Sequence, residues 1–114
     1  MTNGRVVLVP FPFDDLTGAK VRPAVCLTNT VGPHRHVVLA FIISQIPPDR
    51  LESDVVLDAM APDFGATGLK TTSTLRLHRL MTVTVSLIRR DLGFLPPPVQ
   101  ADVAAKLRHL FDLR

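Results

Sequence analysis

Ten prolines divide this 114-residue chain into short apolar segments, and this spacing limits what the chain can fold into. Proline lacks a backbone donor and disrupts helix interiors, so short apolar runs between prolines favour β-strands. A continuous apolar run such as Val37–Ile43 is typical of a strand that is buried on both faces. The sequence predicts strands at Arg5–Val9, Pro23–Thr28, Val37–Ser44, Val55–Leu57, Ser73–His78 and Met81–Ser86.

The segment Pro97–Leu110 has helical rather than strand periodicity. Its apolar side chains predict a stripe that packs on the sheet, and its polar side chains are expected to face outward. The predicted stripe consists of Val99, Val103, Leu107, Leu110 and Phe111, and the outward set of Gln100, Asp102, Lys106 and Arg108. We therefore expect a mainly β protein with a C-terminal helix, folded as a single domain over residues 1–114.

Composition narrows the class of protein. Hydrophobic residues make up 46% of the chain and charged residues 20%, which is typical of a globular protein and argues against disorder. No apolar stretch approaches a membrane span, and no signal peptide is recognisable. The lone Cys26 cannot form an internal disulfide and lies in an apolar run, which predicts a buried thiol in a reducing, cytoplasmic setting.

Arg22 is a charged residue at the point where a polar loop passes into an apolar strand, next to the stiff backbone of Pro23. A planar, permanently charged guanidinium suits phosphate better than the point charge of lysine does. The alternative is an ion pair with Asp14 or Asp15 that closes the loop. The net charge of +3 agrees with a phosphate-bearing partner, although many ordinary domains are equally basic.

Four segments of the chain resemble, in order and spacing, the MazF/PemK toxins. They are Val6–Asn29 with its F-P-F turn and R-P-A motif, Ile42–Gln45, Gly68–Lys70 with Ser73, and Leu92–Leu95. The resemblance implies a small SH3-like barrel of the MazF/Kid/CcdB type. It also implies a sequence-specific endoribonuclease from a toxin–antitoxin pair, acting on single-stranded RNA as a homodimer, with a cognate antitoxin as its protein partner.

RNA can be cut without a metal because its own 2′-hydroxyl is a nucleophile, provided that the enzyme supplies proton transfer and charge stabilisation. We expect Arg22 and Arg76 to neutralise the phosphate and Ser44 to donate a positioning hydrogen bond. Arg76 and His78 would share one face of a regular strand, and an imidazole can transfer protons near neutral pH. The alternatives are a solvated His78 and a Ser44 that caps the strand end.

Three positions depart from the pattern of the relatives. Ile43 replaces a threonine, Thr17 stands where some relatives place a glutamate, and His78 stands where an acidic residue is found in one branch. We expect no cofactor and no metal, and RNA contacts from Phe13, Asp15, Thr17, Lys20 and Ser73. The departures leave open a binding module without cleavage, as in the related CcdB toxins, which inhibit DNA gyrase, or a barrel whose arginines are structural.

Overall fold

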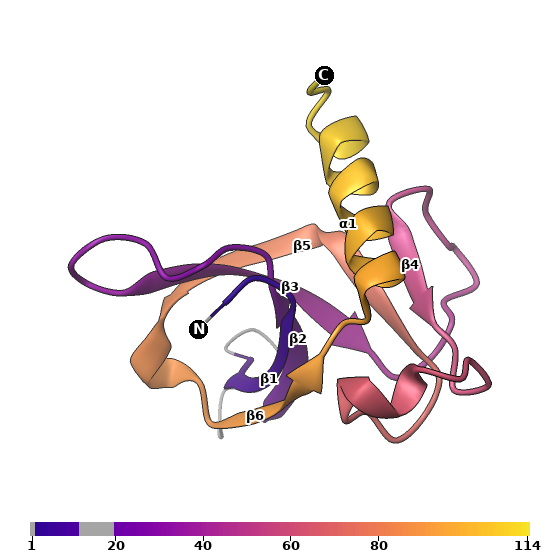
Figure 1. The fold of residues 1–114 in the computed structure, drawn as a ribbon, viewed down its shortest axis with the longest axis horizontal. Coiled ribbons are helices and arrows are strands. Elements are labelled where there is room, and N and C mark those ends of the chain that lie inside the picture. Colours follow the sequence, from indigo (N-terminus) through magenta and orange to yellow (C-terminus); the bar gives the residue numbers. More distant parts are fainter. Residues whose placement is uncertain (1, 12–19) are drawn as a thin grey trace.

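The computed structural model describes residues 2–11 and 20–114. The described residues form a six-stranded antiparallel sheet followed by a C-terminal helix (Figure 1). The elements are β1 (Arg5–Pro10), β2 (Val21–Cys26), β3 (His36–Ile43), β4 (Asp54–Leu57), the 3₁₀ turn η1 (Phe64–Thr67), β5 (Ser73–Thr84), the 3₁₀ turn η2 (Val85–Leu87), β6 (Arg90–Phe94) and α1 (Pro97–Leu110).

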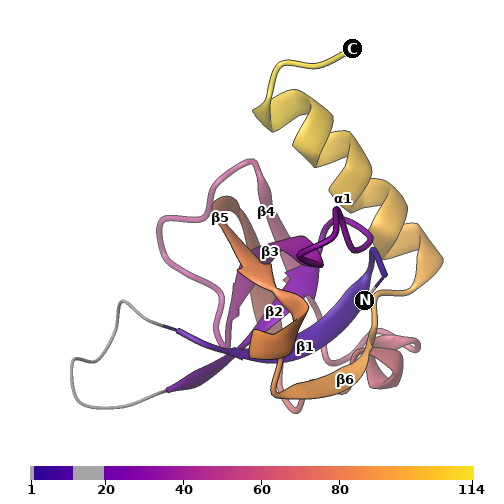
Figure 2. The same cartoon turned by 90° about the vertical axis from the view of Figure 1, so that its left-hand side faces the viewer.

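The strands are ordered β4-β5-β3-β2-β1-β6, and every pairing is antiparallel. The sheet is strongly curled, so that its edge strand β6 lies below β3 and β5 together with η1, and α1 rises from one side (Figures 1 and 2). This arrangement confirms the predicted mainly β fold with a C-terminal helix. Among the described residues, no helix has the length and apolar character needed to cross a membrane.

Apolar side chains pack on both faces of the curled sheet. Along β1, Val6 belongs to a core that also holds Leu75 and Leu77, while Val7 and Val9 belong to a second core on the other face. This alternation is the two-residue period of a strand with both faces covered. The run Val37–Ile43 behaves in the same way, with Ala40 and Ile42 in the first core and Leu39 and Phe41 in the second, so the predicted burial of this strand on both faces is confirmed.

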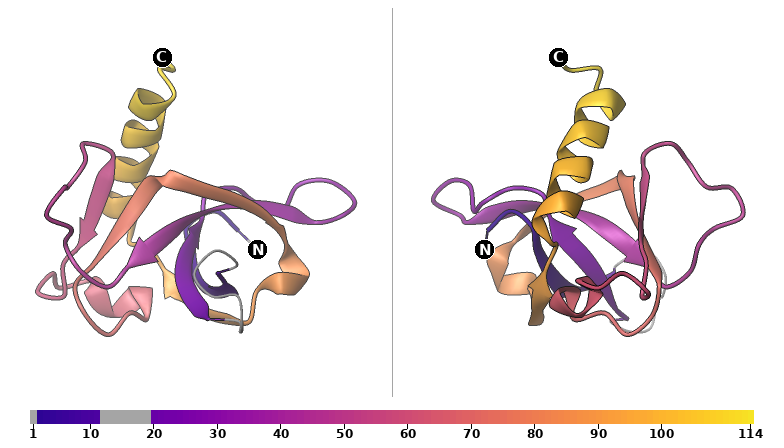
Figure 3. Two further views of the ribbon diagram at one scale, coloured as in Figure 1. Left: turned by 180° about the vertical axis from the view of Figure 1, so that it is seen from behind. Right: turned by 45° about the vertical axis from the view of Figure 1, so that its right-hand side comes forward.

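Helix α1 packs on the first of these cores through its N-terminal part. Val103 is buried, and Val99 and Leu107 contact the core, but Phe111 is 54% exposed. The last turn extends beyond the sheet (Figures 1 and 3), so the predicted apolar stripe ends earlier than expected. Lys106, which was expected to face solvent, instead donates from Nζ to the backbone oxygen of Asp54 at 2.9 Å and ties α1 to β4.

Gly68 and Gly93, which belong to two of the four segments that resemble the MazF/PemK toxins, allow η1 and the loop after it to pack closely against β6. A Cβ on Gly68 would overlap the backbone oxygen of Leu92, and its φ of +73° is a conformation that favours glycine. A Cβ on Gly93 would overlap the backbone oxygen of Ala66. The segments around Gly68 and Gly93 therefore lie against each other, and the absence of a side chain at each glycine allows the two backbones to approach closely.

Candidate functional site

Strands β2 and β3 separate at one end of the sheet and leave an open seam. Their ladder ends at the pair Ala24–Phe41. On either side the ladders continue: β1 pairs with β2 as far as Val21, and β3 pairs with β5 as far as Ile43. The first half of β2 and the last part of β3 therefore belong to two different halves of the sheet, with a gap between them.

Pro23 gives a physical reason for the seam. Phe11 and Lys20 form a hydrogen-bonded pair, with Phe11 N donating to Lys20 O at 2.8 Å. Bonded and non-bonded pairs alternate along an antiparallel ladder, so Leu8 and Pro23, which lie opposite each other, form a non-bonded pair. The backbone nitrogen of Pro23 consequently faces β3, and a proline nitrogen has no hydrogen to donate. Pairing with β3 stops at this residue.

A bulge in β5 brings an arginine to the seam. Ala40 and Phe41 are consecutive in β3, but their partners Leu80 and Arg76 are four residues apart. The residues between these partners, 77–79, have no counterpart on β3. A bulge of this kind breaks the alternation of side chains and re-aims them. Arg79, which a regular strand would place on the face opposite Arg76, lines the seam instead.

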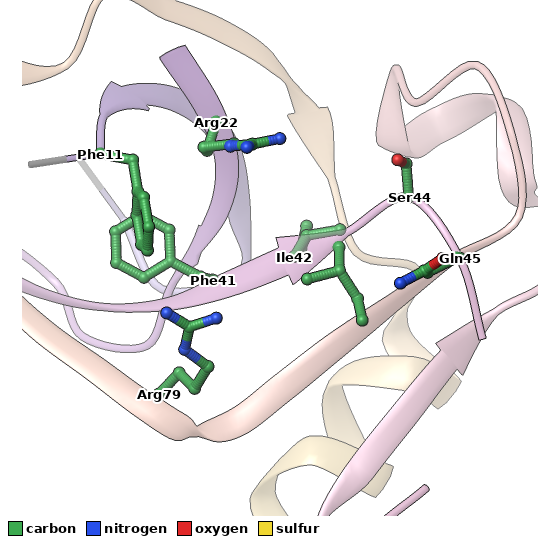
Figure 4. A pocket seen from close by; sticks show the side chains of 8 residues that line it. Phe11, Arg22, Phe41, Ile42, Ser44, Gln45 and Arg79 are labelled. Carbon is green, nitrogen blue, oxygen red and sulfur yellow. The ribbon is translucent and has the colours of Figure 1, made fainter. Parts of the chain in front are cut away.

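The seam forms a hollow of about 330 Å³ that is open to solvent. Figure 4 shows Arg22 from β2 and Arg79 from β5 on either side of the end of β3. One end of the hollow is aromatic, because the rings of Phe11 and Phe41 meet there edge to face, with centroids 4.7 Å apart. The hollow is lined by Phe11, Arg22, Phe41, Ile42, Ile43, Ser44, Gln45 and Arg79. Of these described residues, none is acidic.

Arg79 is held in place by an aromatic ring rather than by a carboxylate. Its guanidinium carbon lies 5.2 Å from the centroid of the Phe11 ring, which is a cation–π distance. Its side chain is exposed, and no carboxylate among the described residues pairs with it. The guanidinium donors of Arg79 are therefore directed at solvent, next to the hollow that Arg22 also lines.

The chain that leaves β3 forms the outer wall of the hollow. Strand β3 ends at Ile43, so the side chains of Ser44 and Gln45 need not alternate between the two faces of the sheet. As a result, three consecutive residues, Ile43, Ser44 and Gln45, line the hollow. The buried Thr74 fixes this turn by donating from Oγ1 to the backbone oxygen of Gln45 at 2.7 Å. Ser44 is exposed, and its hydroxyl is the one hydroxyl among the described lining residues.

Arg76 and His78 do not line this hollow. Arg76 pairs with the buried carboxylate of Asp54, with two hydrogen bonds of 3.2 Å, and lies 3.9 Å from Asp49. His78 is exposed within the bulge, beside Arg79. The structure thus brings together Arg22 and Ser44 of the four predicted catalytic residues, and places Arg79 where Arg76 was expected.

The predicted RNA-contacting residues are spread over several places. Phe13, Asp15 and Thr17 lie outside the described residues. Lys20 is exposed immediately before β2, which begins at Val21. Ser73 is buried at the start of β5, where its hydroxyl donates to the backbone oxygen of Thr71 at 2.8 Å, and it lines a second hollow next to the first.

Sequence reasoning missed Arg79, although a signal was present. Polar residues His78 and Arg79 stand side by side between Leu77 and Leu80, which breaks the period of two and is a local sign of a bulge.

Among the described residues, neither the cysteine nor a cluster of metal-ligating side chains provides a second reactive site. Burial raises the pKa of the Cys26 thiol to about 11, and its side chain is fully covered, so it is an inert core residue, as the sequence predicts. Within residues 2–11 and 20–114, no three histidine, cysteine, aspartate or glutamate side chains gather in a way that could hold a metal ion.

Comparison with known proteins identifies the family. Residues 2–111 match a family described as PemK-like, MazF-like toxin of type II toxin–antitoxin system. No curated protein matches the chain significantly.

Solved structures share the fold over nearly the whole chain. Mycobacterium tuberculosis toxin MazF-mt6 is 24% identical with a TM-score of 0.73, and the match covers 96% of this chain and 98% of that one. MazF from Deinococcus radiodurans is 20% identical with a TM-score of 0.71, covering 99% and 97% of the two chains. An endoribonuclease from a mycobacterial species, solved in complex with its cognate antitoxin, is 13% identical with a TM-score of 0.73, covering 100% and 97%.

Proposed function

The chain belongs to the PemK-like, MazF-like toxin family of type II toxin–antitoxin systems, and from this we propose that it cuts single-stranded RNA in the hollow between β2 and β3. The observation that carries the proposal is the approach of two arginines, Arg22 and Arg79, to one open hollow with no acidic residue among its described lining. Such an arrangement favours an anion with several oxygens, and the phosphodiester of RNA is that anion.

The proposed reaction needs no cofactor and no metal. The 2′-oxygen of the nucleotide attacks the adjacent phosphorus and loses its proton to a base. The bond from phosphorus to the 5′-oxygen breaks, and an acid supplies a proton to that oxygen. The products are a 2′,3′-cyclic phosphate and a 5′-hydroxyl. Negative charge builds on the phosphate during the attack, and fixed donors at that point are the largest expected source of rate enhancement.

We assign roles to the residues of the hollow accordingly. Arg22 and Arg79 donate to the non-bridging oxygens of the phosphate, and Ser44 donates a hydrogen bond that orients it. His78 lies beside Arg79 on the exposed bulge, and its role in proton transfer remains a prediction. Arg76, which was predicted as the second phosphate ligand, is instead assigned to the ion pair with Asp54.

The biological setting follows from the family. We propose that the protein acts as a homodimer in the cytoplasm and is inhibited by a cognate antitoxin. A mycobacterial endoribonuclease and the Deinococcus radiodurans MazF of similar fold have each been solved together with an antitoxin, which supports this partner class. A disordered segment of the antitoxin that orders on binding would compete with RNA for the arginine-lined hollow.

A second candidate function is binding without cleavage, and Ile43 is the observation that favours it. Ile43 lines the hollow where relatives have a threonine, so its side chain can donate no hydrogen bond to phosphate.

One experiment separates the two functions. Purified protein is incubated with a long RNA in EDTA, and the ends of any fragments are analysed. Discrete fragments with cyclic phosphate ends support the nuclease, whereas intact RNA at high protein concentration, together with growth arrest on expression, supports the binding function.

A further inference from the structure

A second hollow, of about 300 Å³, opens on the other face of the same seam. Leu8 and Pro23 line it, and they lie opposite each other in the β1–β2 ladder. Neighbouring strand residues point to opposite faces, so the side chain of Arg22 enters the first hollow and that of Pro23 the second. Ser44 lines both hollows, and the two therefore meet at the end of β3.

Close backbone packing holds the two walls of the second hollow in place. One wall is the segment from Gly68 to Ser73, and the other is β6 with Arg90 and Leu92. Gly68 fixes the distance between these walls, because any side chain there would overlap the backbone of Leu92. The volume is at the lower end of the range of about 300–1,000 Å³ that is typical of ligand pockets.

The charges around this hollow are all positive. Lys70 and Arg90 are exposed, and neither pairs with a carboxylate among the described residues. Leu8, Pro23, Leu69 and Leu92 make its interior apolar, and no acidic residue lines it among the residues that the structure describes. An apolar interior with cations at its rim matches a nucleotide, which has a flat, largely apolar base face and an anionic phosphate.

We propose that the second hollow is a nucleotide subsite for the RNA strand that passes over Ser44. The base of a nucleotide next to the cleaved phosphate lies on the apolar interior, and its phosphate contacts Lys70 and Arg90. The RNA backbone then turns around the end of β3 from one face of the seam to the other. This proposal rests on the proposed function, since it extends the same RNA strand beyond the arginine-lined hollow.

The test is the salt dependence of binding to 2′-O-methyl RNA, which lacks the nucleophile and stays intact. The variant is Lys70→Ala/Arg90→Ala, and the control is Arg108→Ala/Arg114→Ala, which removes the same charge from the C-terminal end of the chain. Each phosphate contact with a single strand contributes about 0.7 to the slope of log K against log salt. We expect the slope to fall by about 1.4 and the affinity at low salt to fall on the order of tenfold.

The control should bind like the wild type, and all four replaced side chains are exposed, so the fold should be unchanged. A Lys70→Ala/Arg90→Ala variant that matches the control in slope and affinity would overturn the subsite while leaving the nuclease intact. Unchanged RNA binding with weaker antitoxin binding would assign the hollow to the protein partner and also overturn the subsite. If the wild type neither binds nor cuts RNA, the proposed function fails, and the subsite fails with it.

Discussion

The guanidinium of Arg76 donates two hydrogen bonds to the carboxylate of Asp54, from Nε and from an η nitrogen, each 3.2 Å long. The Asp54 side chain is fully buried, and that of Arg76 is 12% exposed. The same carboxylate accepts from Leu51 N at 2.9 Å, and the backbone oxygen of Asp54 accepts from Lys106. Asp54 therefore links β4 to β5 through Arg76 and to α1 through Lys106. The sequence predicts Arg76 as a phosphate ligand, but its guanidinium is engaged by Asp54.

Replacing Arg76 with alanine should destabilise the protein. The change leaves the Asp54 carboxylate buried without its cation, and breaking a buried pair in this way typically costs about 3–5 kcal/mol. Urea unfolding followed by circular dichroism measures the free energy. Arg89→Ala, which removes an exposed arginine, should change it by less than about 0.5 kcal/mol. Equal stability of the two variants would show that the Arg76–Asp54 pair contributes nothing.

Replacing Arg79 with alanine should have the opposite profile, with activity lost and stability retained. Its guanidinium lies at the surface over Phe11 and makes no ion pair with the described residues. Removing one donor that stabilises transition-state charge typically lowers the rate by about 10²–10³-fold. Single-turnover RNA cleavage measures this loss, with Arg89→Ala as the control of equal charge. Wild-type cleavage by Arg79→Ala would remove Arg79 from the site.

A side chain at position 93 should destabilise the protein, whereas a side chain at position 65 should be tolerated. A Cβ on Gly93 would overlap the backbone oxygen of Ala66, but nothing lies within 4 Å of a Cβ on Gly65 in the same region. Overpacking costs about 1–3 kcal/mol, so Gly93→Ala should lower the melting temperature while Gly65→Ala leaves it nearly unchanged. If the two variants melt together, η1 does not pack on β6 as described.

Cys26 should make stability fall at alkaline pH. Burial raises the pKa of its thiol from 9.0 to about 11, so between these values the folded state keeps a proton that the unfolded state has lost. The unfolded state binds fewer protons there, and the free energy of unfolding must decrease as pH rises. The chain has no tyrosine, and a Cys26→Ala variant retains every other titrating group. We expect its unfolding free energy to depend less on pH between 9 and 11, and identical slopes would contradict the assignment.

Local sequence patterns are sufficient for most of the strands and for the helix, but not for β6, the full length of β5 or the site. The strand predicted at Arg5–Val9 and the helix predicted at Pro97–Leu110 were both correct, because nearby residues determine them. The length of β5 was not, because the two strands predicted at Ser73–His78 and Met81–Ser86 join through a bulge that depends on pairing with β3. Strand β6 was not predicted either, because its polar start at Arg90 has little strand character and is held by pairing with β1.

The same limit applies to the residues that line the hollow. The place of Arg22 there could be predicted because a charge next to Pro23 at a strand entrance is a local feature. The presence of Arg79 rather than Arg76 at the hollow could not be predicted, because Arg76 pairs with Asp54, a carboxylate 22 residues away, and Arg79 lies over the ring of Phe11. Long-range pairing decided which arginine reaches the hollow, and no alternation rule within β5 contains that information.

The most direct test of the nuclease site is RNA cleavage by Arg22→Ala in EDTA under single-turnover conditions. The melting temperature and circular dichroism spectrum of the variant should stay close to those of the wild type. We predict a loss of cleavage of about 10²-fold or more, with partial activity in Arg22→Lys, which keeps the charge but not the planar fork. Wild-type cleavage by a folded Arg22→Ala protein would contradict the assignment of the β2–β3 hollow as the site of reaction.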